Sequence, residues 1–133
     1  MTVLFKVPPV EPDGDLLTLE AKPYGLATLT RGDRVFLWWS ETQGGAGLVG
    51  HGLCHEASFD GIVWRAAVEV IDDRFRGFGK ADLANWRNAG SDVPLATLAA
   101  KLYKHSLNKV VAISASETAF LDAVLGHHTS EDS

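Results

Sequence analysis

Four tryptophans are the residues of this sequence best suited to binding a flat ligand. Two of them, Trp38 and Trp39, are adjacent in an apolar run that ends at Ser40, and the others are Trp64 and Trp86. Stacking one nucleobase on an aromatic ring contributes about 1–3 kcal/mol. Because neighbouring strand residues point to opposite faces, only one of the adjacent pair can enter a flat core layer. The other is expected against a helix, an interface or a ligand, and packing of all four as core is the alternative.

A histidine-containing segment is the best candidate for a metal site. Its potential ligands are His51, Cys54, His55 and Glu56. Alternation along a strand would place the two histidines on one face and the other two residues on the opposite face. Two histidines make only half of a tetrahedral zinc site, and no third ligand has a convincing spacing. We therefore predict no bound metal and no cofactor.

Motifs of the common enzyme classes are missing from the sequence. It contains no G-x-S-x-G nucleophile elbow, no P-loop, no dinucleotide-binding glycine pattern and no H-E-x-x-H. A catalytic site would need titratable side chains gathered on one surface. His51 and Glu41 could face each other across one hairpin, and a histidine suits acid–base work near neutral pH. The complete set of loose candidates is Glu41, His51, His55, Tyr103 and Lys104.

Charge is distributed unevenly along the chain. The formal net charge is −5, but residues 65–109 contain eight basic and five acidic residues and are net +3. An acidic chain disfavours long nonspecific contact with duplex, because phosphate neutralisation supplies most of that affinity. A short single strand, a nucleotide or a small anion near one basic face remains compatible with this pattern. The alternative is that these charges are simply solvated.

Length and composition predict one soluble domain. The 133 residues are 46% hydrophobic and 22% charged, which is ordinary for a folded protein. No apolar run approaches the roughly 18 residues that a membrane span needs, and the first residues show no signal pattern. The lone Cys54 excludes an internal disulfide and fits a reducing compartment. We expect a cytoplasmic protein without membrane contact, with one domain over residues 1–126 and a polar tail over residues 127–133.

Hydrophobic patterning predicts strands separated by turns, followed by short helices. The predicted strands cover residues 2–7, 16–21, 34–40, 48–56, 62–72 and 109–114, and the predicted helices cover 80–88, 95–103 and 116–125. Ser114 and Glu117 have the spacing of a capping box, and Gly126 is expected to end the last helix. The three central strands, joined by turns, predict an antiparallel meander. The whole order predicts an α+β fold around a small curved sheet.

The central hairpin resembles that of a known superfamily. It is similar to PUA-like domains, most of all to the EVE branch, which has YTH and ASCH domains as relatives. The similar residues are Gly32-Asp33-Arg34-Val35-Phe36-Leu37-Trp38-Trp39-Ser40, a glycine-rich turn, and Gly47-Leu48-Val49-Gly50-His51-Gly52. Residues 102–111 and the terminal helix also resemble the closing part of that fold. The resemblance covers about half of the chain. It implies a small mixed or antiparallel curved β-barrel with short flanking helices.

The resemblance also implies a pocket for a flipped or single-stranded modified base, with aromatic walls and polar groups that read the base edge. By position, Trp39 and Ser40 would form one wall and its polar neighbour, and Trp38 replaces Trp39 if the register differs by one. The candidates for the opposing wall are Trp64, Trp86 and Tyr103. Contacts to phosphate would come from Arg87, Lys104 and His105. The glycines at positions 44, 45 and 47 would let the backbone approach the ligand closely.

Three functions follow from these observations. The first is a non-catalytic module that recognises a modified nucleobase in DNA or RNA. The second is a protein-interaction or homo-oligomerisation domain, in which an exposed tryptophan is buried against a partner such as a second copy. The third is a nuclease or nucleotide hydrolase, of the kind that some ASCH-like domains suggest. We predict the first and keep the other two as alternatives.

Overall fold

The computed structural model describes residues 1–25, 27–86, 92–103 and 108–131. Its strands are β1 (Thr2–Val7), β2 (Leu16–Tyr24), β3 (Arg34–Trp39), β4 (Gly47–Phe59), β5 (Trp64–Asp72) and β6 (Lys109–Ile113). Its α-helices are α1 (Lys80–Leu83), α2 (Pro94–Tyr103) and α3 (Ala115–Glu131), and its 3-10 turns are η1 (Glu41–Gln43) and η2 (Ala84–Trp86). All six predicted strands are present.

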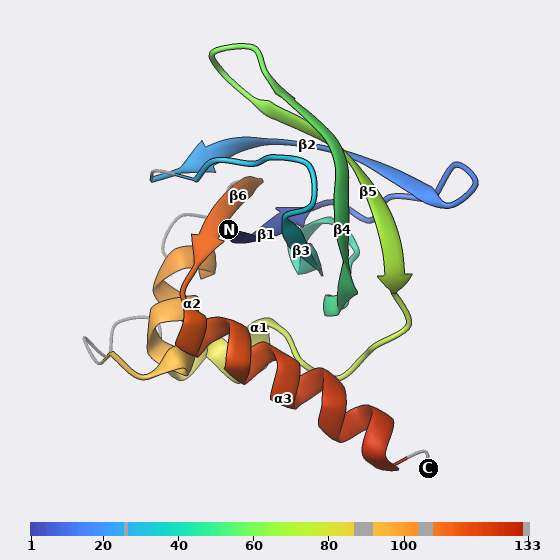
Figure 1. The fold of residues 1–133 in the computed structure, drawn as a ribbon. Helices are drawn as coiled ribbons and strands as arrows, with labels where there is room; N and C mark the ends of the chain where they lie inside the picture. Colours follow the sequence, from blue (N-terminus) through green and yellow to red (C-terminus); the bar gives the residue numbers. More distant parts are fainter. Residues whose placement is uncertain (26, 87–91, 104–107, 132–133) are drawn as a thin grey trace.

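The strands close into a barrel in the order β1-β3-β4-β5-β2-β6 (Figure 1). Strands β3, β4 and β5 form the predicted antiparallel meander. Two pairs, β1 with β3 and β2 with β6, are parallel, whereas β1 with β6 and β2 with β5 are antiparallel. The barrel is therefore mixed, and the prediction of a small α+β barrel is confirmed.

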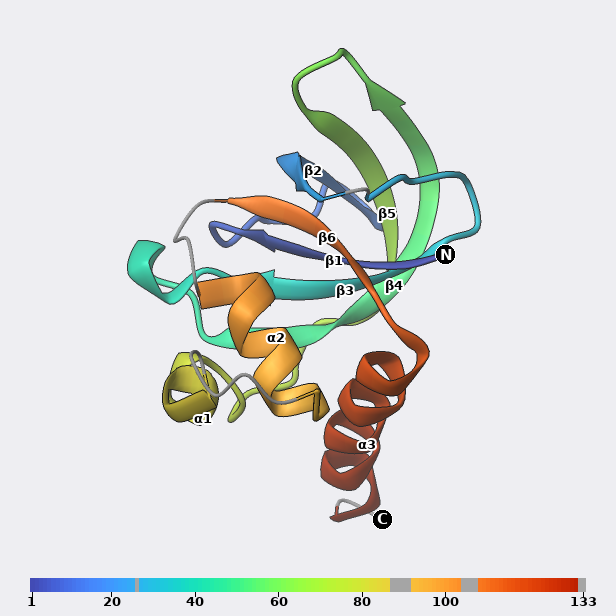
Figure 2. The same ribbon diagram turned by 90° about the vertical axis from the view of Figure 1, so that its left-hand side faces the viewer.

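Alternation along the strands divides the apolar residues between two cores. In β1, Phe5 points into the barrel, whereas Leu4 points outward beneath the helices. The first group, here called the barrel core, includes Leu37 and fills the barrel. The second group, the helix-side core, includes Leu98 of α2 and lies between the barrel wall and the helices. Both views show the helices gathered on one side of the barrel (Figures 1 and 2).

The helices follow the sequence signals at their starts more closely than at their ends. Pro94 occupies the first position of α2, as its fixed backbone angle favours. The predicted helix over residues 80–88 is divided between α1 and η2 within the described residues. The prediction that the last helix ends at Gly126 is wrong, because α3 continues to Glu131 and takes up most of the predicted tail. None of the helices in the described ranges is both long and apolar enough to cross a bilayer.

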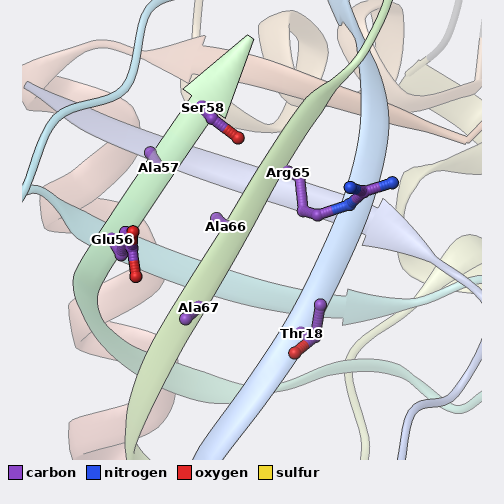
Figure 3. Close-up of a pocket in the computed structure, with 7 residues that line it drawn as sticks. All are labelled: Thr18, Glu56, Ala57, Ser58, Arg65, Ala66 and Ala67. Atoms are coloured by element: carbon purple, nitrogen blue, oxygen red, sulfur yellow. The ribbon is translucent and has the colours of Figure 1, made fainter. Parts of the chain in front are cut away.

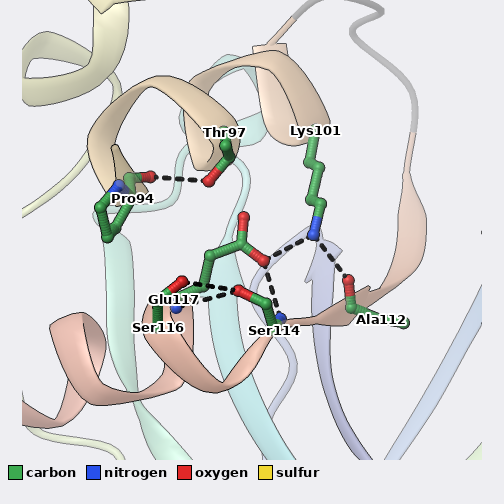
Figure 4. A network of polar contacts seen from close by, with 7 residues as sticks. All are labelled: Pro94, Thr97, Lys101, Ala112, Ser114, Ser116 and Glu117. Carbon is green, nitrogen blue, oxygen red and sulfur yellow. Dashed lines mark hydrogen bonds and ion pairs between the residues drawn. The ribbon is translucent and has the colours of Figure 1, made fainter. Parts of the chain in front are cut away.

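A hydrogen-bonded network joins α2, β6 and the start of α3 (Figure 4). Glu117 accepts from the Ser114 backbone N–H at 2.8 Å, and Ser114 Oγ accepts from the Glu117 N–H at 3.1 Å. These reciprocal bonds confirm the predicted capping box. The same carboxylate forms an ion pair with Lys101 Nζ at 2.5 Å, and that ammonium also donates to the Ala112 carbonyl. Glu117 therefore fastens α3 to α2 as well as capping its own helix.

The β4–β5 hairpin is longer at its tip than predicted and projects away from the helices (Figure 1). Pairing between β3 and β4 ends at Arg34 and Leu53, while β4 continues to Phe59. The register between β4 and β5 shifts at two points, one of which leaves an extra residue at His55. We call residues 55–65 the overhang. It is the part of the barrel wall that lies beyond β3.

Candidate functional site

The structure places the adjacent tryptophans in different cores. Trp38 is 0% exposed in the helix-side core, and Trp39 is 7% exposed in the barrel core. Of the three surroundings expected for the ring outside the core layer, a helix, an interface or a ligand, the structure shows the first, because Trp38 packs beneath the helices. The expectation that either ring forms an open stacking wall is not met, because packed side chains cover both rings. Ser40 is also buried, and its hydroxyl lies 3.1 Å from the Thr42 hydroxyl.

A chain of hydrogen bonds runs from Trp38 toward the surface. The Trp38 indole N–H donates to Tyr103 Oη at 2.8 Å, and the Tyr103 hydroxyl donates to Glu41 Oε1 at 3.0 Å. The same carboxylate oxygen accepts from the Lys80 backbone N–H. Burial is the main reason why the pKa of Tyr103 is raised well above its ordinary value. Tyr103 is thus held as a neutral donor, and Glu41, which is only half-buried, is the outermost acceptor of the chain.

Three lysines occupy directly opposite positions on neighbouring strands. Lys6 of β1 pairs with Lys109 of β6, and Lys109 pairs with Lys22 of β2. All three side chains are on the outer face of the barrel, because the residues beside them in each strand point inward. We call these residues the lysine row. Like charges directly opposite each other across strands are unfavourable, so this arrangement concentrates positive potential at some cost in stability.

Lys6 is the most deeply buried member of the lysine row, with an exposure of 2%. Its ammonium donates to the Leu102 carbonyl at 2.9 Å and lies 4.5 Å from the centre of the Tyr103 ring. No carboxylate of the described residues lies within ion-pair distance of it. Burial lowers the pKa of Lys6 to about 8, with smaller contributions from Lys109 and Lys80 in the same direction.

Backbone carbonyls in the last turn of α2 partly compensate the buried positive charge of Lys6. Lys6 bonds to the Leu102 carbonyl, and Lys109 Nζ bonds to the Lys101 carbonyl at 2.8 Å. These carbonyls belong to the helix C-terminus, where backbone acceptors lack partners and the dipole attracts cations. Lys109 also lies over the Tyr24 ring, 4.6 Å from its centre. The lysine row therefore has a structural role at the end of α2, beside any role in binding.

The glycines after β3 serve protein packing. A Cβ on Gly45 would lie 2.4 Å from the Trp39 carbonyl carbon, and one on Gly47 would lie 2.6 Å from the Gly79 Cα. These contacts correct the expectation that both glycines let the backbone approach a ligand. Gly44 faces open space and, with a φ of +90°, ends η1 in a conformation that favours glycine.

The other predicted wall residues do not join the Trp38–Tyr103–Glu41 chain. Trp64 stacks on Phe59 in the overhang, with ring centres 5.1 Å apart, and packs against the barrel core. Trp86 is 36% exposed at the end of η2. Among the predicted wall residues that the structure describes, Trp38 and Tyr103 are joined by a hydrogen bond. The three residues predicted to contact phosphate, Arg87, Lys104 and His105, lie outside the described residues.

The candidate catalytic histidine does not face Glu41. His51 is opposite Phe36 in the β3–β4 register, whereas Glu41 comes after Trp39 at the far end of β3. The predicted juxtaposition across the hairpin is therefore wrong. The reason is that the hairpin turn separates these residues by several positions along the paired strands.

His51 instead belongs to a cluster that fastens α3 to the barrel. Arg34 forms a two-pronged ion pair with Asp122 of α3, and its Nη2 lies 3.2 Å from His51 Nδ1. Burial lowers the pKa of His51, and the Arg34 charge lowers it further. In the parts of the chain that the structure describes, no group of three or more His, Cys, Asp or Glu side chains is placed to hold a metal ion.

Two shallow hollows lie on the overhang. The first, of about 270 Å³, is lined by Thr18, Glu56, Ala57, Ser58, Arg65, Ala66 and Ala67 (Figure 3). The second, of about 550 Å³, is lined by Leu29, Thr30, Arg31, His55, Glu56 and Ala57. Neither contains a member of the lysine row or a buried charged group. We therefore regard the lysine row, with Glu41 and Tyr103, as the candidate functional site.

Sequence reasoning did not identify the lysine row, because its members are far apart in the chain and meet only through strand register. One signal was available: Lys6 is a charged residue inside an otherwise apolar strand. Comparison of the chain with models of known protein families, with curated proteins and with solved structures finds no match to any of them.

Proposed function

We propose that this protein is a non-catalytic module that binds a nucleotide, or a short single strand carrying a modified base, at the lysine row. The phosphate is bound by the ammonium groups of the row, and the base edge is read by Glu41, which the Tyr103 hydroxyl holds in place. This proposal keeps the nucleobase function expected from the resemblance to PUA-like domains, but it assigns recognition to polar groups in place of an open indole wall.

The observation that carries the proposal is the buried Lys6 ammonium. It has one carbonyl acceptor for three N–H donors, and no carboxylate of the described residues lies within ion-pair distance of it, although Glu41 acts on it from farther away and partly offsets the lowering of its pKa. Two further lysines, Lys109 and Lys80, are close enough to lower its pKa. Burying charge without a partner is unfavourable, and an anionic group from a ligand would reduce that cost.

Glu41 and Tyr103 give the site the means to distinguish ligands. Glu41 accepts hydrogen bonds and is half-buried, so it suits the amino or imino donors of a base edge. Tyr103 is held in place by the Trp38 N–H and by Glu41 itself. Because Trp38 bonds directly to Tyr103, its fluorescence reports on changes in the cluster.

Calorimetric titration with ribonucleoside monophosphates and short single-stranded oligonucleotides tests the proposal. Replacing Lys6 with methionine removes the ammonium and keeps an apolar side chain of similar length. We expect Lys6→Met to weaken binding by about 10- to 100-fold, the equivalent of about 1.5–3 kcal/mol for a bond to a charged group. The matched control is Arg74→Ala, which removes one exposed positive charge elsewhere. It should change affinity by less than about threefold.

The pH dependence separates a binding role from a capping role. Lys6 loses its proton near pH 8, so affinity for a phosphate group should fall as the pH rises through about 8. In the free protein the lowered pKa has the opposite effect on stability. The unfolded chain binds the Lys6 proton more tightly, so the free energy of unfolding should rise between pH 8 and about 10. Lys6→Met should reduce both changes.

Two outcomes would overturn the proposal. One is the absence of measurable heat with every nucleotide and oligonucleotide at millimolar concentration. The other is binding that Lys6→Met and Glu41→Gln leave unchanged. If Lys6→Met lowers the free energy of unfolding but not the affinity, the ammonium serves only as the cap of α2.

A further inference from the structure

The overhang leaves one edge of β4 without a partner strand. Backbone alternation identifies the groups on that edge. The Val70 N–H donates to the Asp15 carbonyl on the β2 side. The backbone N–H and C=O groups of even-numbered residues at this end of β5 therefore point toward β2, and those of odd-numbered residues point toward β4. Arg65 is odd-numbered and lies opposite Ser58 of β4, so the backbone groups of Ser58 point toward β5 and bond to it. It follows that Ala57 and Phe59 direct their N–H and C=O groups away from β5.

No described residue pairs with these outward groups. The segment that leads into β3 pairs with β4 only as far as Cys54, which forms backbone hydrogen bonds with Gly32 and Asp33. Beyond this point, the hollow of about 550 Å³ separates the residue range 29–31 from His55, Glu56 and Ala57. The edge is thus open in its hydrogen bonds and has free space beside it. An exposed edge of this kind is a template for another strand.

The tip of the overhang also exposes apolar side chains. Phe59 is 46% exposed and Ile62 is 64% exposed, although Phe59 stacks on Trp64. Charged side chains that would discourage pairing are few on the edge itself, where Ala57 and Phe59 carry the outward backbone groups. Apolar side chains beside an open edge favour association with another strand.

We propose that this edge pairs with the same edge of a second copy, antiparallel, around a two-fold axis at Ala57. Such pairing joins two barrels through one continuous sheet and is isologous, because each copy contributes the same strand. Ala57 then exchanges two backbone hydrogen bonds with its own counterpart. The small side chain of Ala57 leaves the strands free to approach.

The side chains on the outer face support this self-pairing. Glu56, Ser58 and Arg65 share that face (Figure 3). Pairing about Ala57 places Glu56 of one copy opposite Ser58 of the other, and Arg65 is the next residue in the same row. Opposite charges are thus separated by a small residue, and Glu56 never faces its own counterpart. This register avoids the repulsion that like charges directly opposite would cause.

The association does not depend on the proposed nucleotide site. The lysine row is on β1, β6 and β2 beside α2, whereas the overhang projects on the side away from the helices (Figures 1 and 2). Loss of dimers would therefore leave nucleotide affinity unchanged, and loss of nucleotide binding would leave dimers intact. The two proposals can fail separately.

Sedimentation velocity over roughly a hundredfold range of concentration tests the pairing. Because the covered surface is small, we expect a dimer with a dissociation constant in the micromolar range. Ala57→Pro removes the outward N–H without removing a bond to β5, since Ala57 does not donate to that strand. Two intermolecular bonds are lost per dimer, so we expect dissociation to become about 10- to 30-fold easier. Ala57→Ser keeps the N–H and is the matched control, with the dimer retained.

A charge reversal gives a second test that does not alter the backbone. Glu56→Lys brings a positive charge toward the partner's Arg65 and should weaken the dimer. Adding Arg65→Glu to the same chain restores opposite charges and should restore association, even though it removes the exposed Glu20–Arg65 ion pair. Circular dichroism on each variant establishes that the barrel is still folded.

A protein that stays monomeric at all these concentrations would disprove the proposal. So would a dimer that Ala57→Pro and Glu56→Lys leave unchanged, because its interface would then lie elsewhere. If Ala57→Pro unfolds the chain, the charge reversal and its rescue decide the question alone.

Discussion

The helix-covered face of the barrel and the overhang depart from the usual distribution of residues in opposite ways. Beneath the helices, Lys6, Lys109 and Glu117 are almost fully buried although they are charged. On the overhang, Phe59 and Ile62 are 46% and 64% exposed although they are apolar. Ordinary domains bury apolar residues and leave charges in water. In each region, therefore, the distribution of residues is less favourable for stability than in an ordinary domain.

The element that covers a strand determines which side chains the strand can bury or expose. Under α2, the helix C-terminus provides carbonyls for Lys6 and Lys109, so charge can be buried there. The overhang has no covering element among the described residues, and its edge groups at Ala57 remain available. Substitutions should consequently be costly on the helix-covered face and inexpensive on the overhang. Matched pairs of residues, one from each region, test this comparison.

The largest contrast is expected between two tryptophans. Trp38→Ala should destabilise the protein by about 3–5 kcal/mol, because it leaves a cavity in the helix-side core and removes the hydrogen bond to Tyr103. Trp64→Ala removes a partly exposed ring and should cost about 1–2 kcal/mol. Urea unfolding measures both values. Equal losses would mean that the overhang is packed as firmly as the helix-covered face.

A second contrast compares two glutamates. Glu117→Gln weakens the ion pair with Lys101 and the capping box, and it should cost about 2–3 kcal/mol. Burial by itself would raise the pKa of Glu117, but the bonds from Lys101 and Ser114 outweigh it and lower the pKa. The ion pair therefore persists into acid. Glu56→Gln, on the overhang, should change the free energy of unfolding by less than about 0.5 kcal/mol at concentrations where the protein is monomeric. A similar cost for both variants would contradict the comparison.

The smallest effect concerns His51 and appears only on acidification. Burial lowers the pKa of His51 in the folded state, so the unfolded chain takes up its proton first. The stability associated with neutral His51 is present above its ordinary pKa of 6.5 and is lost as the pH falls below it. Thermal unfolding at about pH 7.5 and about pH 5.5, one value above that pKa and one below it, should show this loss in the native sequence. His51→Gln should reduce this loss, and an unchanged loss in that variant would place the sensitive group elsewhere.

Much of the local structure was predictable from the sequence. The run Arg34–Trp39 is dense in β-branched and aromatic residues, and it is a strand. The Ser114–Glu117 spacing predicted a capping box that the structure contains. Both signals act over a few neighbouring residues, which is why they needed no knowledge of the rest of the chain. The end of α3 was missed because one glycine in a helix is a modest penalty that the flanking residues can offset.

The candidate site was much less predictable. Of its polar residues, Tyr103 was identified as a possible pocket wall and Glu41 only as a possible catalytic group, and neither was linked to Lys6. Their proximity depends on α2 crossing the barrel where β1 ends, which no local pattern encodes. The bulge at His55 was also not predictable from the sequence, and it changes which residues of β4 face outward.

Local patterns in the sequence set where strands and helices begin, which residues alternate between the two faces of a strand, and that Trp38 and Trp39 face different sides. What lies on each of those sides depends on the folded chain. Packing put both indoles in the interior, aligned three lysines across β1, β6 and β2, and left the edge at Ala57 open. This division arises because backbone geometry is set by neighbouring residues, whereas burial, strand register and charge proximity depend on segments far apart in the chain.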